Sequence, residues 1–395
     1  MKALNNTMVI STYNIQLQMS DTTHNYWLSL LNHIRDAYNQ CANMVASAGI
    51  PLSLVAVHAL CYDKLRADFP QLPSQAVIRV QKAVLAAFRS IKKNKHKNAD
   101  TPQRKKLALQ LDKRLYSRLS SQGIALSNGT PQKREFCTFV SYDKAMELFK
   151  SCSFADPTIF ARDGKLFLSV PFEVPTPPCG DDTSIGVDLG MKRLFVTSEG
   201  KFYSDKEYLS KRRKLRYLKR CLQGKDTRSS KRHLAKVSRK EYNLSKDMQH
   251  RAAKALIEST NASVLVLEDL KKLKQNTSKT DKGFNRSRHN NAISQVPFAS
   301  FKDILTHKAQ LVGKRVETVS PTWTSQIDSR SNKRDGNRQG CRYCCSDGIV
   351  LDADWNAAVN IGLRANHPLS SSLPIDGKLM PLSGKALSTA LTPKA

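Results

Sequence analysis

The stretch Ser184-Ile185-Gly186-Val187-Asp188-Leu189-Gly190 is typical of a buried strand that carries a single acidic residue. Asp188 lies between Val187 and Leu189, and a glycine flanks this trio on either side. A lone carboxylate in an apolar strand is costly, because the loss of hydration penalises its charged form. We therefore expect Asp188 to have a cation beside it or a chemical role.

The same anomaly recurs twice further along the chain. Residues 264–267 (Val-Leu-Val-Leu) form an apolar run that ends in Glu268, and Asp354 lies at the start of a predicted helix. Each carboxylate alone is explained equally well by a helix cap or a salt bridge. Three isolated carboxylates at the ends of core elements, far apart in sequence, together predict one shared divalent-metal site.

The residue types of this predicted site favour phosphodiester cleavage. Two divalent ions about 4 Å apart clamp the attacking and leaving oxygens of such a displacement. Mg²⁺ takes oxygen ligands, keeps several waters and needs only a few carboxylates per ion. We therefore expect a metal-dependent nuclease in which Asp188 bridges two Mg²⁺ ions and Glu268 and Asp354 each bind mainly one of them.

The charge balance indicates a polyanionic partner. The 395 residues include 64 Lys and Arg against 33 Asp and Glu, a formal net charge of +31, and such an excess is typical of nucleic-acid binding. A basic ribosomal or membrane-surface protein would show the same charge. Because no apolar run approaches the length of a membrane span and the N-terminus lacks a signal-peptide hydrophobic region, we expect no membrane partner.

The cysteines predict a reducing compartment. Six of the nine are scattered singly, and only Cys341, Cys344 and Cys345 cluster. This distribution argues against a disulfide framework and predicts a cytosolic protein.

The first half of the chain contains both strand and helix patterns. An alternating strand at residues 9–17 precedes a region at 25–97 whose apolar spacing predicts three helices. Residues 114–174 contain short β-rich runs, in which Arg162-Asp163-Gly164 predicts the turn of a hairpin. We expect a small barrel that includes the first strand, an inserted helical bundle, and then a linker at 175–182.

The second half follows a different order. After the strand that carries Asp188, the pattern predicts a hairpin, a long helical segment, the strand that ends in Glu268, a helix, a strand at 316–319 and the helix of Asp354. This mixed order, with acids on two strands and a helix, is what an RNase H-like fold requires.

A basic segment lies between the hairpin and the second of these strands. Between residues 211 and 240, 14 of 30 residues are Lys or Arg and only Asp226 is acidic. A solvated helical face is the ordinary explanation, but the near absence of counter-charges favours a phosphate-binding surface on two helices. The candidate residues are Arg212, Arg213, Arg216, Lys219, Arg220, Lys231 and Arg232.

Four motifs resemble those of the TnpB family, which comprises transposon-encoded, RNA-guided DNA nucleases related to type V CRISPR effectors. The motifs are Gly186-Val187-Asp188-Leu189-Gly190, Leu267-Glu268-Asp269-Leu270, Thr324-Ser325-Gln326 and Asp352-Ala353-Asp354-Trp355-Asn356-Ala357-Ala358-Val359-Asn360-Ile361. They span about residues 184–365, whereas the first half resembles the family in layout. Leu72-Pro73-Ser74-Gln75-Ala76 also resembles the start of a bundle helix in the family, which makes Gln75 a further candidate for nucleic-acid contact.

The resemblance implies an RNA-guided DNA endonuclease. The family uses a guide RNA made beside the gene, recognises a short T-rich flanking motif on the DNA, and cleaves both strands with one RuvC site. The implied partners are therefore a guide RNA and double-stranded target DNA, and the implied cofactor is a pair of Mg²⁺ ions. We expect a monomer that carries RNA in the prokaryotic cytosol or nucleoid.

The resemblance also implies a multidomain architecture of the α+β and α/β classes. A wedge-type β-barrel with an inserted helical recognition bundle precedes an RNase H-like RuvC nuclease domain with a small insert. The expected boundaries are 1–20 and 114–180 for the barrel, 21–113 for the helical domain, 181–320 and 351–366 for the nuclease domain, 321–350 for a degraded zinc-ribbon-like insert, and 367–395 for a C-terminal tail.

The insert departs from the family pattern. The family usually has two Cys-x-x-Cys pairs that hold zinc, but the first pair's positions here read Asp328-Ser329-Arg330-Ser331, while Cys341-Arg342-Tyr343-Cys344 preserves the second. Because a structural zinc site needs four nitrogen or sulfur ligands, we expect zinc at Cys341 and Cys344 to be weak or absent. The insert would then be held by Arg and Lys residues that pair with its acids Asp328, Asp335 and Asp347, or by packing of its aromatic residues Trp323 and Tyr343.

Three alternatives stay open on the sequence alone. A miniature type V CRISPR effector would use the same chemistry, and a CRISPR array or a transposon end beside the gene would separate the two. A nuclease-dead, RNA-guided repressor is disfavoured because all three acids are present. A plain nucleic-acid-binding protein would not need acids at the ends of core elements.

Overall fold

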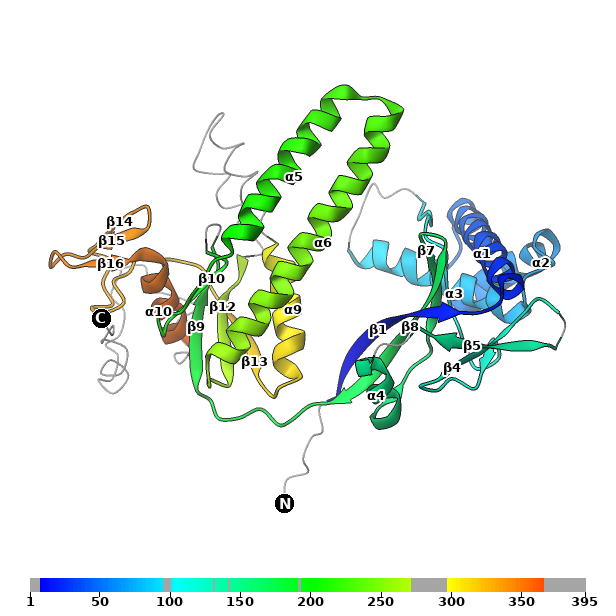
Figure 1. Cartoon of the computed structure of the whole chain (residues 1–395), viewed down its shortest axis with the longest axis horizontal. Helices are drawn as coiled ribbons and strands as arrows, with labels where there is room; N and C mark the ends of the chain where they lie inside the picture. The colour runs from blue at the N-terminus through cyan, green and yellow to red at the C-terminus, as the bar shows by residue number, and fades with distance from the viewer. Residues whose placement is uncertain are drawn as a thin grey trace, which may run out of the picture. The chain divides into compact units, whose positions relative to one another are not determined.

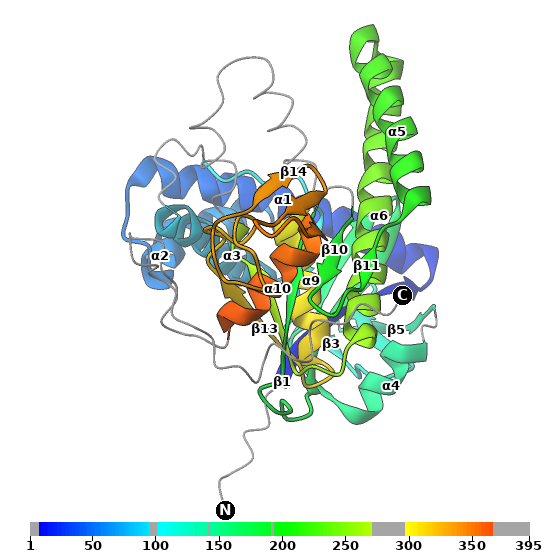
Figure 2. The same ribbon diagram turned by 90° about the vertical axis from the view of Figure 1, so that its left-hand side faces the viewer.

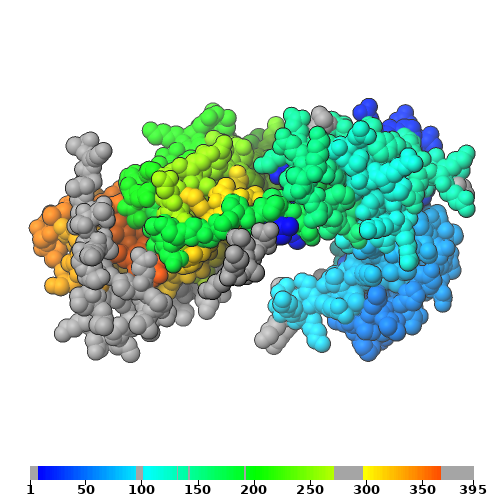
Figure 3. All heavy atoms as spheres, turned by 90° about the horizontal axis from the view of Figure 1, so that it is seen from below, coloured from blue at the N-terminus to red at the C-terminus, as the bar shows by residue number. Residues whose placement is uncertain are grey.

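The computed structural model describes residues 8–94, 101–130, 132–140, 143–190, 193–270 and 297–365. The chain forms two compact units, drawn as a ribbon in Figure 1 and as spheres in Figure 3. The first is Met8–Pro175, and the second comprises the described residues from Thr176 onward. The predicted tail at 367–395 lies outside the described residues.

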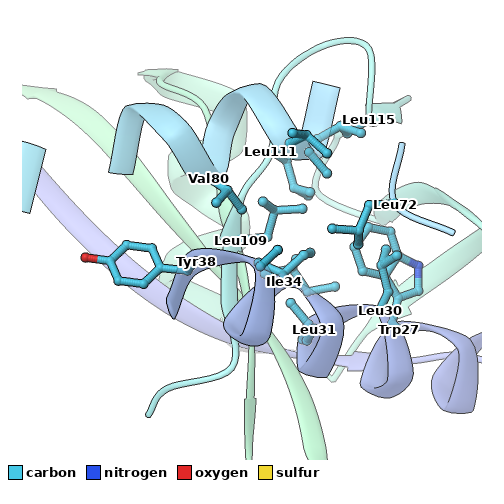
Figure 4. Close-up of a cluster of buried hydrophobic side chains, with 14 of the residues drawn as sticks. Trp27, Leu30, Leu31, Ile34, Tyr38, Leu72, Val80, Leu109, Leu111 and Leu115 are labelled. Atoms are coloured by element: carbon cyan, nitrogen blue, oxygen red, sulfur yellow. The ribbon is translucent and has the colours of Figure 1, made fainter. Parts of the chain in front are cut away.

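Three helices of the first unit form a bundle: α1 (Asp21–Ala48), α2 (Leu54–Asp68) and α3 (Ser74–Lys93). α1 begins where the Ser20 hydroxyl accepts a hydrogen bond from the Thr23 N–H, and it ends at Gly49 in the left-handed region, with φ 59°. Apolar residues at helical spacing bury one side of each helix. Figure 4 shows part of this core, where Ile34 of α1 and Val80 of α3 belong to one cluster.

The bundle is inserted between the first two strands of an eight-stranded sheet, β1 (Met8–Gln18) and β2 (Ala108–Gln110). The strand order is β2-β7-β8-β1-β5-β4-β3, with β6 paired to β8. The helix α4 (Asp143–Ser151) follows β5 along the chain. The remaining strands are β3 (Tyr116–Ser117), β4 (Gly123–Ser127), β5 (Arg134–Phe139), β6 (Ser153–Phe154), β7 (Thr158–Arg162) and β8 (Lys165–Pro175).

The predicted small barrel is present in part, because this sheet curls into a half-barrel whose two end strands do not pair with each other in the described residues. Within the described ranges, the outer strands β2 and β3 each pair with one neighbour only. β2 has three residues and β3 has two, and α1 and α3 contact β2. Strands this short offer few backbone groups for closure, and the bundle lies against one of the two edges. The predicted hairpin is confirmed, because Arg162 of β7 pairs with Lys165 of β8.

The second unit is built on a five-stranded sheet in the order β11-β10-β9-β12-β13. β9 (Ser184–Asp188), β10 (Phe195–Thr197) and β11 (Phe202–Tyr203) are antiparallel neighbours, whereas β12 (Val264–Glu268) is parallel to both β9 and β13 (Arg315–Val319). The helices α5 (Lys206–Lys225) and α6 (Arg228–Ser259) join β11 to β12, α9 (Phe298–Gln310) precedes β13, and α10 (Ala353–Ala365) comes last. This is the order of elements that the sequence predicts.

Helices pack on both faces of this sheet, as Figure 1 and Figure 2 show from two directions. Leu265 and Leu267 of β12 share a core with α6 and α9. Val264 and Val266 point to the opposite face and pack with Ile361 of α10. Because both faces are covered, the strand is a continuous apolar run instead of an alternating one.

The basic segment forms the antiparallel helix pair α5–α6, which extends beyond the sheet of its own unit (Figure 1). The chain turns at Asp226, which has φ 45°, and Thr227 caps α6 by accepting a hydrogen bond from the Ser230 N–H. The insert before α10 contains a small sheet of β14 (Asn337–Gln339), β15 (Arg342–Cys344) and β16 (Val350–Asp352). In the part of the chain that the structure describes, no helix has the length and apolar character needed to cross a membrane.

Candidate functional site

The fold brings the three predicted carboxylates together. Asp188 and Glu268 end the adjacent parallel strands β9 and β12, and the pairing of Leu267 with Val187 places both at the same edge of the sheet. Asp354 lies in the first turn of α10, which packs on β9. The charges of both Glu268 and Asp354 act on Asp188 and raise its pKa.

Two glycines allow α10 to approach β9 this closely. A Cβ atom added at Gly186 would lie 2.0 Å from the Ala358 carbonyl oxygen and 2.3 Å from the Gly362 nitrogen, both on the α10 backbone. A Cβ at Gly362 would in turn lie 3.0 Å from the Gly186 nitrogen. The absence of a side chain at these positions therefore determines how far Asp354 lies from Asp188.

Burial makes two of the three carboxyl groups, Asp188 and Glu268, hard to ionise. Burial raises the pKa of Asp188 to about 7, with further increases from Glu268 and Asp354 and an opposing effect of the Arg338 guanidinium. Burial also raises the pKa of Glu268, although the Thr324 hydroxyl donates a hydrogen bond to Glu268 Oε1 and opposes the increase. Carboxyl groups in this situation are stabilised in their charged form by a nearby cation.

Two arginines that the sequence analysis did not single out supply positive charge here. Arg338 Nη2, on β14, lies 2.8 Å from Asp354 Oδ1. Arg193 Nη1 lies 2.6 Å from Asp352 Oδ2 and 3.8 Å from Asp354 Oδ2. Arg193 follows Asp188 by five residues, a proximity that could have indicated it. No local pattern separates Arg338 from the other basic residues of the insert.

The donor set fits a hard divalent cation such as Mg²⁺. All three groups are carboxylates, the ligand type that Mg²⁺ takes in proteins, and burial together with the charges of Glu268 and Asp354 raises the pKa of Asp188. Among the described residues, no three His, Cys, Asp or Glu side chains form a ready set of metal ligands. Asp354 is paired with Arg338 instead, so a guanidinium supplies the positive charge beside the cluster.

Several predicted phosphate-binding residues of α5 and α6 are exposed to solvent. Arg213 and Arg220 are exposed on α5, and Arg232 is exposed on α6. Lys231 is also exposed and pairs with Asp226 at 2.9 Å across the turn. These four side chains can reach a phosphate without leaving the helix surface.

The other three predicted residues of this segment make contacts within the helix pair. Arg216 Nε and Lys219 Nζ lie 3.0 and 2.7 Å from the carboxylate oxygens of Glu241 on α6. The guanidinium carbon of Arg212 lies 5.6 Å from the centroid of the Tyr208 ring. The structure thus separates cations that join α5 to α6 from cations that face solvent.

Gln75 belongs to the first unit and lies in the first turn of α3. Its Nε2 donates a hydrogen bond to Asp112 Oδ2, and its Oε1 accepts one from Arg114 Nη1 at 3.3 Å. The amide is therefore held by residues that follow the bundle, in a different unit from the carboxylates.

The insert is held by ion pairs and a buried tyrosine. Arg330 bridges Asp328 and Asp347 with nitrogen–oxygen distances of 2.8 and 3.0 Å, and the Asp328 side chain is only 1% exposed. The hydroxyl of the buried Tyr343 donates a hydrogen bond to the Gln326 carbonyl oxygen at 3.0 Å. Ion pairing of these acids and packing of Tyr343 were both predicted from the sequence of the insert.

The residues of the insert do not fit a structural zinc site. Cys341 is exposed and Cys344 is half-buried, and neither belongs to a group of three potential metal ligands within the described chain. Burial and a hydrogen bond with Asp328 raise the pKa of Cys345 to about 11. Zinc binds the thiolate, so a zinc ion at Cys345 would have to displace a tightly held proton.

Two family models match the chain. The model OrfB_IS605, described as a probable transposase, matches residues 167–287, and the Cas12f1-like TNB domain matches residues 298–361. InsQ of Escherichia coli (strain K12), which is named provisionally as an RNA-guided DNA endonuclease, is 27% identical over 230 residues. Together these matches support a TnpB-family protein. Asp188 and Glu268 lie in the stretch that the first model matches, and Asp354 lies in the stretch that the second matches.

The match to InsQ covers 53% of this chain and 56% of that relative. The chain thus spans about half the length of the curated relative that it matches. The cryo-EM structure of a Cas12f1–sgRNA–target DNA complex is similar with a TM-score of 0.58 and 14% identity, over 87% of this chain and 83% of that one. At this identity the likeness shows a shared multidomain α+β fold.

Proposed function

We propose that this TnpB-family chain is an RNA-guided DNA endonuclease. One observation carries the proposal: carboxylates from β9, β12 and α10 gather at one sheet edge although roughly 170 residues separate Asp188 from Asp354 along the chain. The name of InsQ and the composition of the Cas12f1 complex support a guide RNA and double-stranded target DNA as the partners.

The second unit would be the nuclease domain, with an RNase H-like fold of the RuvC type. In support, the central strand β9 lies between an antiparallel neighbour and a parallel one, and the acids end the adjacent strands β9 and β12. The open sheet and the helical bundle of the first unit would be the wedge and recognition domains. The residues from 321 to 350 would be a small insert, which the ion pairs of Arg330 and the buried Tyr343 hold together.

In this proposal Asp188, Glu268 and Asp354 would hold two Mg²⁺ ions, which would supply Lewis-acid chemistry for phosphodiester hydrolysis. Asp188 is central because both other carboxylates act on it. Arg338 and Arg193 keep positive charge beside the carboxylates and so favour the approach of an anionic phosphodiester.

The exposed cations of the α5–α6 pair would bind the phosphates of the guide RNA or of its duplex with the target strand. Such contacts are independent of sequence, and base pairing with the guide supplies the specificity. We also place the protein in the cytosol, because all nine cysteines are free thiols in the structure.

The substitution Asp188→Asn tests the proposal, because the amide keeps the shape of the side chain and removes its charge. We expect target cleavage in Mg²⁺ to fall by about 10²-fold to 10³-fold or more, while the affinities for RNA and target DNA stay nearly unchanged, since they come from phosphate contacts and base pairing. Asp303→Asn, at an exposed carboxylate of α9, is the matched control and should cleave like the wild type. Wild-type cleavage by Asp188→Asn would refute the proposed site, and the absence of a defined RNA from the purified protein would refute RNA guidance.

A further inference from the structure

A buried loop of the insert connects two of the three carboxylates. Thr324 and Ser329 on this loop are 2% and 4% exposed. Its hydrogen-bonding partners are two asparagines of α10, Asn356 and Asn360, which are also buried. Polar side chains as buried as these are retained where each has a partner.

Both asparagines are satisfied by the backbone of this loop. Asn356 Nδ2 donates to the Ile327 carbonyl oxygen at 2.7 Å, and Asn356 Oδ1 accepts from the Ser329 N–H at 2.9 Å. Asn360 Nδ2 donates to the carbonyl oxygens of Thr324 and Ile327 at 2.9 and 2.8 Å. Helix α10 therefore holds the loop at both of its ends.

The side chain of Thr324 faces the carboxylate at the end of β12. Its hydroxyl donates to Glu268 Oε1, and the Pro321 carbonyl oxygen lies 3.2 Å from the same hydroxyl oxygen. A hydroxyl has one proton, and an ionised carboxylate accepts it more strongly than a carbonyl does. Within the described part of the chain, Thr324 is the donor that the structure records for Glu268.

We propose that Thr324 and Asn360 are positioning residues that fix the carboxylate of Glu268 relative to that of Asp354. Asp354 and Asn360 both belong to α10. Asn360 donates a hydrogen bond to the Thr324 carbonyl oxygen, and the Thr324 hydroxyl donates one to Glu268. The inference rests on the proposed function, because it assigns this link to the predicted Mg²⁺ ligands.

The link has a physical consequence for metal binding. A glutamate side chain has several rotatable bonds, and without a fixed partner it populates conformations in which its oxygens point away from the ion. Hydrogen-bond partners behind a metal ligand typically affect metal affinity by about 10-fold to 100-fold. Loss of the Thr324 hydroxyl should therefore weaken metal binding and leave nucleic-acid affinity unchanged.

The test compares Thr324→Val, which removes the hydroxyl, with Thr324→Ser, which keeps it. Mn²⁺ binding to the intact protein–RNA complex, followed by electron paramagnetic resonance without DNA, gives a readout that does not require cleavage. We expect the Mn²⁺ dissociation constant to rise by about 10-fold to 100-fold in Thr324→Val and to return close to the wild-type value in Thr324→Ser. The Mg²⁺ concentration for half-maximal cleavage should shift in parallel.

A merely structural role would give a different result. Thr324→Val would then lower the melting temperature and the cleavage rate at every Mg²⁺ concentration, with no change in Mn²⁺ affinity, and the proposal would be overturned. Asn360→Leu should weaken Mn²⁺ binding as Thr324→Val does. The double variant should bind Mn²⁺ no more weakly than whichever single variant has the lower Mn²⁺ affinity, because both substitutions interrupt the same link. Additive losses would exclude the role of Asn360.

The failure of this inference can be distinguished from the failure of the proposed function. The metal site itself is refuted if the wild-type protein binds no Mn²⁺, or if Asp188→Asn binds Mn²⁺ as tightly as the wild type. The link is then refuted with it. If wild-type protein shows such binding and Thr324→Val binds Mn²⁺ equally well, only the link is refuted.

Discussion

The close packing of α10 on β9 leads to a sharp prediction for the substitution Gly186→Ala. The added Cβ would lie 2.0 Å from the Ala358 carbonyl oxygen and 2.3 Å from the Gly362 nitrogen. Both atoms belong to the helix backbone, so neither can rotate away as a side chain could. Helix α10 must therefore move outward by about 1 Å to restore an ordinary contact distance.

This displacement should affect both stability and activity. Overpacking of a well-packed contact typically costs about 1–3 kcal/mol of unfolding free energy, and the contact at Gly186 is with backbone, which places the expected cost at the upper end. Asp354 moves together with its helix. A misplacement of about 1 Å at a reacting centre can lower the rate by about 100-fold, so cleavage should fall by this order even where the protein stays folded.

Chemical denaturation and single-turnover cleavage measure the two effects. The matched control is Gly224→Ala near the end of α5, where an added Cβ would meet no atom within 4 Å. Alanine in a helix is favoured over glycine by about 0.5–1 kcal/mol, so this control should be slightly more stable than the wild type. If Gly186→Ala unfolds at the wild-type denaturant concentration, α10 does not approach β9 as closely as the structure shows.

The ion pairs of the insert, the central carboxyl and the exposed helix cations can each be tested separately. Arg330→Met should lower the unfolding free energy by about 3–5 kcal/mol, because it leaves Asp328 buried without its partner. Urea unfolding measures the loss, and the additional substitution Asp328→Asn should recover most of it. An unchanged urea midpoint in Arg330→Met would contradict this expectation. The pKa of Asp188 is raised to about 7 in the folded protein, so the folded state holds this proton more tightly than the unfolded state does. Metal-free protein should therefore lose stability as the pH rises from about 4 to 7. Melting curves of Asp188→Asn should lack this trend. Reversing Arg213 and Arg220 to Glu should reduce the salt dependence of RNA binding by a slope of about one per lost phosphate contact, and an unchanged slope would show that this face is merely solvated.

The order of elements in the second unit could be predicted because its signals are local. The apolar run 264–267 and the periodic pattern of α10 reveal buried elements without knowledge of their partners. Asp188 and Glu268 were predicted in the same way, since an acid in or at the end of an apolar run is visible from the run alone, and Asp354 was predicted from its place at the start of a helix pattern.

What the sequence could not predict depends on contacts between distant segments. Thr324 contacts Glu268, which lies 56 residues earlier in the chain, and Arg338 of β14 contacts Asp354 of α10. Helical spacing places Arg216 and Lys219 on one side of α5, but only the packed pair shows that Glu241 of α6 faces them.

How far the sheet of the first unit closes could not be predicted for a related reason. Its β-rich runs are recognisable locally, but closure depends on whether the end strands meet. β2 and β3 have only three and two residues, and such lengths are set by the surrounding packing more than by the propensity of the residues.

The position of α10 in the chain has a consequence for synthesis on the ribosome. β9 is made roughly 170 residues before the helix that packs on it. At typical translation rates of about 5–20 residues per second, roughly 10–30 s pass before Asp354 follows Asp188 out of the ribosome. During this interval a nascent chain lacks one of its three carboxylates, and Val264 and Val266 lack the apolar cover of Ile361. An unfinished or truncated polypeptide would therefore be unable to cut nucleic acid near its site of synthesis.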